Sequence, residues 1–150
     1  MTLNRKAATL LIIVLTLALS SVGTALGTGG GNQGCTPGYW KNHLDSWVGY
    51  SPDQEVETVF NPSAPFNKWT LLAALDGGGG PGVDGAVRIL LRAGVAALLN
   101  GAPGSGVYAY YSHDTVIIMV NLALKTGDRA TILAVASELD ARNNQGCPLS

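Results

Sequence analysis

The chain has 150 residues, of which 47% are apolar and 13% charged, and its formal net charge is −1. A chain of this length forms one domain with a real hydrophobic core. Its few basic residues form no patch or stripe, so the attraction that dominates nucleic-acid binding is missing and nucleic acid is excluded as a partner.

Residues 1–27 have the layout of a secretory signal peptide. Arg5 and Lys6 supply the positive start, and an apolar run and several small residues follow. Cleavage is predicted after Gly27 and leaves a net charge near −3, because both basic residues are removed. The alternative is an uncleaved membrane anchor, since the apolar stretch is just long enough to span a bilayer. Either way the sequence predicts a secreted or cell-surface protein.

The cysteines mark the two ends of the predicted domain. Residues 28–34 are Gly-rich and polar, which predicts a flexible leader, and the domain then spans 35–150. In an oxidising compartment, pairing of Cys35 with Cys147 is the default. Such a bridge closes a loop of about 110 residues and stabilises the fold by about 4–5 kcal/mol. Two free or intermolecular thiols are the alternative.

Two helix starts are predicted early in the domain. Thr36 and Pro37 are a cap and a first-turn proline, which predict a short helix through Trp40. Residues 51–54 read Ser-Pro-Asp-Gln and combine a cap, a proline, an acid and a capping-box glutamine. This stronger signal predicts a second helix that ends near Phe60, before an Asn-Pro pair.

The middle of the chain alternates helix, loop and helix. A helix is predicted over 69–75, followed by a glycine-rich loop over 77–85, the most flexible stretch of the domain. Asp84 then opens the clearest helix, whose apolar residues recur at three- and four-residue spacing until Asn100. Gly94 within it predicts the close approach of a neighbouring helix.

Caps define two further helices. Ser112 and Gly127 bound a helix over 113–125, and Asp128 caps a last helix that ends at two asparagines near 143. Residues 116–120 are β-branched enough for a strand, but the flanking caps favour helix. The sequence therefore predicts an all-α fold, a compact bundle of about five or six helices closed by one terminal disulfide.

Motifs at the two ends and in the central helix resemble a known family. The segments are Gly34–His43 (Gly-Cys-Thr-Pro-Gly-Tyr-Trp-Lys-Asn-His), Trp47, Arg88, 96–100, 127–129, Leu139-Asp140 and 143–149 (Asn-Asn-Gln-Gly-Cys-Pro-Leu). They are similar to a family of secreted and surface proteins, mostly prokaryotic, with a CTPGYWKNH motif near the N-terminus and LDxxNNxGCPL near the C-terminus. The resemblance implies secretion, the terminal bridge and a helical core. That family has no established activity, so it supplies no catalytic residues.

The two histidines are the candidates for catalysis. His43 and His113 each have an acid close in sequence, and a cleft that joined them would suit a small secreted hydrolase. No nucleophile signature such as Gly-x-Ser-x-Gly accompanies them. The structural interpretation, which we favour, places His113 and Asp114 at a helix cap and His43 beside Trp40. No catalytic residue is assigned.

Metal and cofactor sites lack their usual patterns. The histidines have no zinc-ligand spacing, and Asp76 and Asp84 lack the alternating acids of a calcium loop. We therefore predict neither metal nor cofactor. Asp84, Arg88 and Arg92 share one helix face, which predicts a solvated ion pair or an arginine that reaches Asp140 on the last helix.

Aromatic residues are the best candidates for binding. Flat rings with polar rims suit protein contacts and stack on sugar rings. The candidates are Tyr108, Tyr110, Tyr111, Trp40, Trp47 and His43. For Trp40 and Trp47 a place in the core is favoured over binding. The leading hypothesis is a non-enzymatic module that binds a surface protein or glycan. The alternatives are the hydrolase and a structural subunit of a surface layer or filament.

Overall fold

The computed structural model describes residues 30–149, so the predicted signal segment 1–27 lies outside the described residues. Within 30–149 the chain forms five α-helices and three short 3₁₀ helices, with isolated β-bridges and no strand. The α-helices are α2 (Pro37–Asn42), α3 (Leu71–Leu75), α4 (Gly82–Asn100), α5 (His113–Thr126) and α6 (Arg129–Asn143); the 3₁₀ helices are η1 (Leu44–Ser46), η2 (Val56–Thr58) and η3 (Phe66–Lys68). The predicted all-α fold is confirmed.

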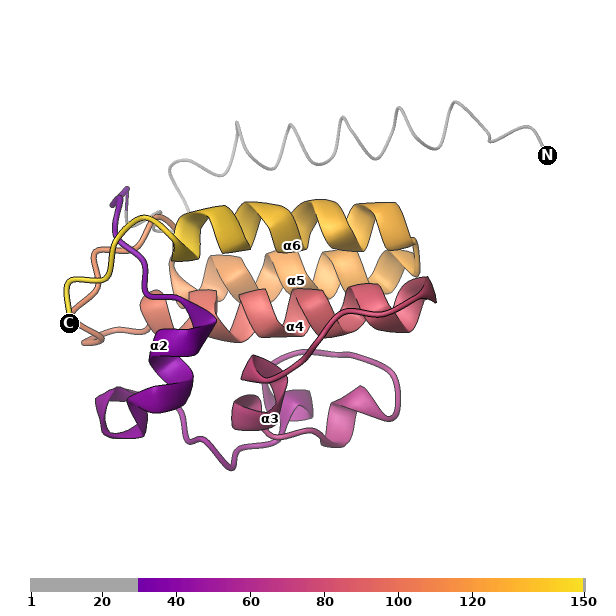
Figure 1. Cartoon of the computed structure of the whole chain (residues 1–150), viewed down its shortest axis with the longest axis horizontal. Helices are drawn as coiled ribbons and strands as arrows, with labels where there is room; N and C mark the ends of the chain where they lie inside the picture. Colours follow the sequence, from indigo (N-terminus) through magenta and orange to yellow (C-terminus); the bar gives the residue numbers. More distant parts are fainter. Residues whose placement is uncertain (1–29, 150) are drawn as a thin grey trace.

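Helix α4 is the centre of the fold. It packs against α2, α3, α5 and α6, and its residues are buried almost without interruption from Gly85 to Asn100. Figure 1 shows α4, α5 and α6 side by side, with α5 running opposite to the other two and with α2 and α3 on the far side of α4. Gly94 allows the close approach of α5, because a Cβ there would lie 3.0 Å from a methyl group of Val120. No helix between residues 30 and 149 has the length and apolar character needed to cross a membrane.

The helix caps formed as the sequence predicted. Ser112 accepts a hydrogen bond from the Thr115 N–H at the start of α5, and Asp128 accepts one from the Thr131 N–H at the start of α6. Gly127 ends α5 with φ of 60°, a left-handed conformation that glycine adopts without strain. A single turn therefore reverses the chain between these two antiparallel helices.

The helix predicted over 51–60 is wrong. The capping-box contact is present, since the Gln54 side chain accepts from the Ser51 N–H, but only a turn and η2 follow. The backbone pairs instead with the start of α3: Val56 N–H donates to Trp69 O over 2.8 Å, and Leu71 N–H donates to Gln54 O over 2.8 Å. These tertiary hydrogen bonds satisfy groups that a helix would have used.

The glycine-rich loop is shorter and more fixed than predicted. Helix α4 begins at Gly82, inside the predicted loop, and the Arg129 guanidinium donates to the carbonyls of Gly80 and Gly82. Gly80 also packs against the first turn of α4, because a Cβ on Gly85 would lie 1.9 Å from the Gly80 carbonyl oxygen. Glycine at position 85 is therefore required by packing.

Both ends of the described chain meet at one end of the bundle (Figure 1). Cys35 and Cys147 form the predicted disulfide, with their Cα atoms 4.4 Å apart. The described part of the predicted leader is attached to the domain, because Gln33 N–H donates to Tyr108 O and Gly34 N–H donates to Gly146 O. The folded domain therefore begins before Cys35.

Candidate functional site

A buried polar network lies next to the disulfide, and we call Cys35, Trp40, Asn100, Asn143 and Cys147 the terminal network. Asn100 is 3% exposed, and its Oδ1 accepts from the Cys35 N–H at 2.9 Å and from Trp40 Nε1 at 3.0 Å. Its Nδ2 donates to Cys35 O and to Asn143 Oδ1, both at 2.9 Å. Asn143 Nδ2 in turn donates to the Ala93 carbonyl, also at 2.9 Å. One amide therefore ties together α2, α4 and α6.

The terminal network gives several residues of the end motifs a role in stabilising the fold. Trp40 is 1% exposed and packs in the core, so it is removed from the candidate binding residues. Trp47 is half-buried beside it, and its Nε1 donates to Trp40 O over 3.0 Å. The favoured core interpretation of Trp40 is confirmed, because a ring without exposed surface offers no contact to a partner.

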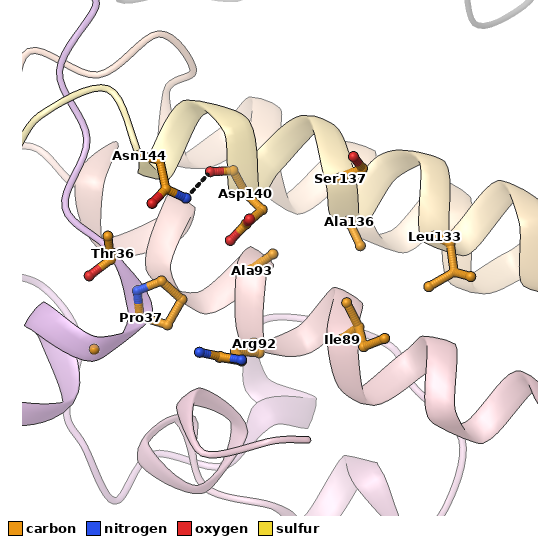
Figure 2. A pocket seen from close by; sticks show the side chains of 11 residues that line it. Thr36, Pro37, Ile89, Arg92, Ala93, Leu133, Ala136, Ser137, Asp140 and Asn144 are labelled. Atoms are coloured by element: carbon orange, nitrogen blue, oxygen red, sulfur yellow. Dashed lines mark hydrogen bonds between the residues drawn. The ribbon is translucent and has the colours of Figure 1, made fainter. Parts of the chain in front are cut away.

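A hollow of about 680 Å³ lies between α4 and α6, beside the start of α2. We call it the α4–α6 groove. Its size falls in the range of about 300–1,000 Å³ typical of ligand pockets. Figure 2 shows the side chains that line it. They are Thr36, Pro37 and Gly38 from the start of α2; Ile89, Arg92 and Ala93 from α4; and Leu133, Ala136, Ser137, Asp140 and Asn144 from α6 and its cap.

Helical spacing places these residues on two facing walls. On α4 they follow each other at intervals of three and one, and on α6 at intervals of three, one, three and four, so each set shares one helix face. Ala93 and Ala136 are buried and small, and they form the floor together with Pro37. Ile89 and Leu133 are half-buried at one end, which makes that end apolar.

Opposite charges occupy the two walls of the groove. Arg92 on α4 and Asp140 on α6 are both exposed, and Figure 2 shows the Asp140 carboxylate pointing from α6 toward α4. Among the described residues neither forms an ion pair, so the predicted bridge between them is absent. The predicted pairing of Asp84 with an arginine is absent there too. Arg88 lies over the Phe66 ring, 5.8 Å from its centroid.

The three tyrosines predicted as a contact face have different environments. Tyr108 is 64% exposed, whereas Tyr111 is 7% exposed and donates its hydroxyl to Glu138 Oε1 over 2.9 Å. Burial and this hydrogen bond raise the pKa of Tyr111 above its ordinary value. Tyr110 lies under the Arg142 guanidinium, 3.9 Å from its ring centroid. Tyr111 is therefore removed from the predicted contact face, whereas the Tyr108 side chain remains exposed to solvent.

Each histidine contacts its own tyrosine. His43 stacks on Tyr39 with ring centroids 4.0 Å apart, and its backbone N–H donates to Trp40 O over 3.4 Å. His113 Nδ1 lies 2.8 Å from the Tyr50 hydroxyl, and its Nε2 lies 3.5 Å from Asp114 Oδ1.

Neither histidine lines the groove. Burial and the nearby Asp114 carboxylate raise the pKa of Tyr50, which keeps the phenol protonated at neutral pH. A phenol in this state is a weak nucleophile. Within residues 30–149, no three His, Cys, Asp or Glu side chains gather closely enough to hold a metal ion.

Comparison of the chain with family models, with curated proteins and with solved structures finds no match. The family resemblance of the end motifs therefore stays a prediction. The groove is not among the sites predicted from the sequence, although one predicted alternative is an arginine, Arg88 or Arg92, that reaches Asp140 on the last helix. The three- and four-residue spacing on both helices was the available signal, and without the packing of α4 on α6 it does not indicate a hollow.

Proposed function

We propose that this protein is an exported, non-enzymatic module that binds a segment of another protein in the α4–α6 groove. The observation that carries the proposal is the groove itself, a hollow with an apolar end and two opposite charges that form no ion pair within residues 30–149. Recognition sites typically combine apolar anchor positions with a few polar groups that fix orientation. The proposed export follows from residues 1–27, and a disulfide is compatible with an extracellular location.

The rigidity of the walls supports binding. Asn143 Nδ2 donates to the Ala93 carbonyl at the groove floor, which fixes the end of α6 against α4. Cys35 bonds to Asn100 immediately before Thr36 and Pro37, so the end wall from α2 is held in the same way. A site that is ordered before binding loses less conformational entropy when a partner arrives. The terminal network thus prepares the groove for a ligand.

A protein segment suits the groove better than a glycan does. Among the described residues no aromatic side chain lines it, whereas sugar recognition commonly relies on stacking against aromatic rings. Two side chains can bond to a ligand backbone. The Thr36 oxygen accepts from the Tyr39 N–H, which leaves its O–H as a donor, and Asn144 Nδ2 donates to Asp140 O, which leaves Oδ1 as an acceptor among the described residues. Tyr108 is the remaining glycan candidate, and it lies outside the groove.

The test is a selection from a phage-displayed library of random heptapeptides against the disulfide-bonded domain. Peptides recovered on the native protein are expected to lose binding to Ser137→Trp, which fills the groove from an exposed position on α6. The matched control is Ala134→Trp, an exposed position on the same helix that does not line the groove. Equal binding to both variants would overturn the assignment of the groove.

A glycan array and native mass spectrometry separate the alternatives. Glycan binding that Tyr108→Ala abolishes, without peptide binding in the groove, would contradict the proposal and place the contact at Tyr108. Concentration-dependent assembly into long oligomers would favour the structural subunit instead. Intact mass of the secreted protein tests export, with a start near Thr28 expected.

A further inference from the structure

The charges of the α4–α6 groove define what kind of segment fits it, and this inference rests on the proposed function. Arg92 belongs to the α4 wall, and Asp140 belongs to the α6 wall. Because neither is neutralised by a neighbour among the described residues, both remain available to a ligand. A ligand with one charge would satisfy one wall and meet repulsion from the other.

The length of the groove limits the segment to a few residues. The α6 wall extends from Leu133 to Asn144, eleven positions, which at a rise of about 1.5 Å per residue spans about 16 Å. An extended chain advances about 3.3 Å per residue, so about five residues fill this span. A segment of this length, rather than a folded domain, therefore matches the span of the groove.

The two ends of the groove give the segment a direction. Ile89 and Leu133 lie together at one end, where they offer an apolar surface to a side chain of the bound segment. The charged residues and then Thr36 and Asn144 follow toward α2 (Figure 2). A matching segment therefore has an apolar residue at one end and its charged residues toward the other.

We propose that the α4–α6 groove binds an extended protein segment that carries an apolar anchor and, within the next few residues, one acidic and one basic side chain. The acidic side chain pairs with Arg92, and the basic one pairs with Asp140. The apolar anchor lies between Ile89 and Leu133. Charge complementarity of this kind selects partners and fixes their register more than it adds affinity.

The experiment uses the peptides recovered in the heptapeptide selection and measures their affinity by isothermal titration calorimetry. Arg92→Glu and Asp140→Lys are each expected to weaken binding about tenfold or more, since a like charge then faces the peptide. Exchanging the acid and the base within the peptide is expected to restore binding to the double variant Arg92→Glu/Asp140→Lys. Arg88→Glu, one turn away on α4 and over Phe66, is the matched control and should leave binding unchanged.

The outcomes distinguish the two claims. Peptides that bind in the groove with equal affinity to the native protein, Arg92→Glu, Asp140→Lys and the double variant would overturn the charge inference and leave the proposed function standing. Recovery of no binding peptide, or of peptides whose affinity Ser137→Trp leaves unchanged, would overturn the proposed function itself. The neutral variants Arg92→Gln and Asp140→Asn provide a second series in case a reversed charge disturbs folding, with a smaller loss of affinity expected for each.

Discussion

The terminal network and the α4–α6 groove lie next to each other and use polar side chains in opposite ways. In the network, Asn100 is 3% exposed and Asn143 is 1% exposed, and each side-chain amide bonds to a partner in the protein. In the groove, Arg92 and Asp140 are exposed and form no ion pair among residues 30–149. Polar groups satisfied inside the protein stabilise the fold, whereas polar groups left open are available to a partner.

This difference changes how the sequence motifs are interpreted. The most distinctive residues of the chain, Cys35, Trp40, Asn143 and Cys147, hold the ends of the helices together. The same motifs also reach the groove, because Thr36, Pro37 and Asp140 belong to them and line it. The rest of the groove, including Ile89, Arg92 and Leu133, comes from parts of α4 and α6 outside the motifs, and only packing brings these residues together.

The largest effect is expected from removing the disulfide. Cys35→Ala/Cys147→Ala opens a loop that spans 112 positions. The free energy of unfolding should fall by about 5 kcal/mol, because the unfolded chain regains the entropy that the bridge removed. Urea unfolding followed by circular dichroism measures the change. A loss below about 1 kcal/mol would mean that the buried hydrogen bonds carry the terminal network without the bridge.

Asn100→Ala should have the next largest effect. It leaves the Cys35 N–H, the Trp40 Nε1–H and Asn143 Oδ1 without their partner in a buried site. We expect a loss of about 4 kcal/mol, since each unsatisfied buried group costs about 1–3 kcal/mol and such costs do not add fully. The matched control Asn144→Ala removes an exposed amide that bonds only to Asp140 O among the described residues. Equal losses for the two asparagines would contradict the distinction between network and groove.

The groove charges should matter little for folding. Arg92→Ala and Asp140→Ala remove exposed side chains that form no ion pair in the part of the chain that the structure describes. Each should change the free energy of unfolding by less than about 0.5 kcal/mol, as is usual for such surface substitutions. Thermal unfolding at pH 7 provides the measurement. A loss comparable to that of Asn100→Ala would show that the charges serve the fold, and the comparison between the two regions would then fail.

The smallest expected effect is on the loss of stability at acidic pH. The terminal network contains no group that titrates, so acid sensitivity should come from exposed carboxylates. Hydrogen bonds from the Thr131 N–H and hydroxyl lower the pKa of Asp128, and bonds from Lys68 and Asn67 lower that of Glu57.

The sign of this acid effect follows from the lowered pKa values. A carboxylate whose pKa is lower in the folded state contributes stability that is full above its unfolded pKa of about 4, and that is lost as the pH falls through the folded value. Asp128→Asn keeps the helix cap without titrating, and should flatten the fall in stability below about pH 4. Chemical unfolding at several pH values measures the slope. An unchanged slope would exclude Asp128 as a source of the acid sensitivity.

The fold was largely predictable because its helix boundaries are local. Ser112, Gly127 and Asp128 act within a few residues of themselves, so the sequence predicts α5 and α6 closely. Residues 51–60 show where this reasoning fails. Their helix-start signal is real, but hydrogen bonds to Trp69 and Leu71 depend on tertiary structure, which local pattern does not contain.

The site was less predictable than the fold. Aromatic type suggested Trp40 and Tyr111, yet their burial depends on neighbours that are distant in sequence. The distance between Arg92 and Asp140 likewise depends on how closely two small residues, Ala93 and Ala136, allow α4 and α6 to approach. Such spacing is a property of the packed helices rather than of either sequence segment.

The most direct test of the central claim is an NMR titration of the ¹⁵N-labelled domain with a heptapeptide recovered in the selection. Amide shifts are expected to change along the α4–α6 groove, near Arg92 and from Leu133 to Asn144, while the resonances around Tyr108 stay in place. Shifts confined to the loop that carries Tyr108 and Tyr110, with the groove unchanged, would contradict it.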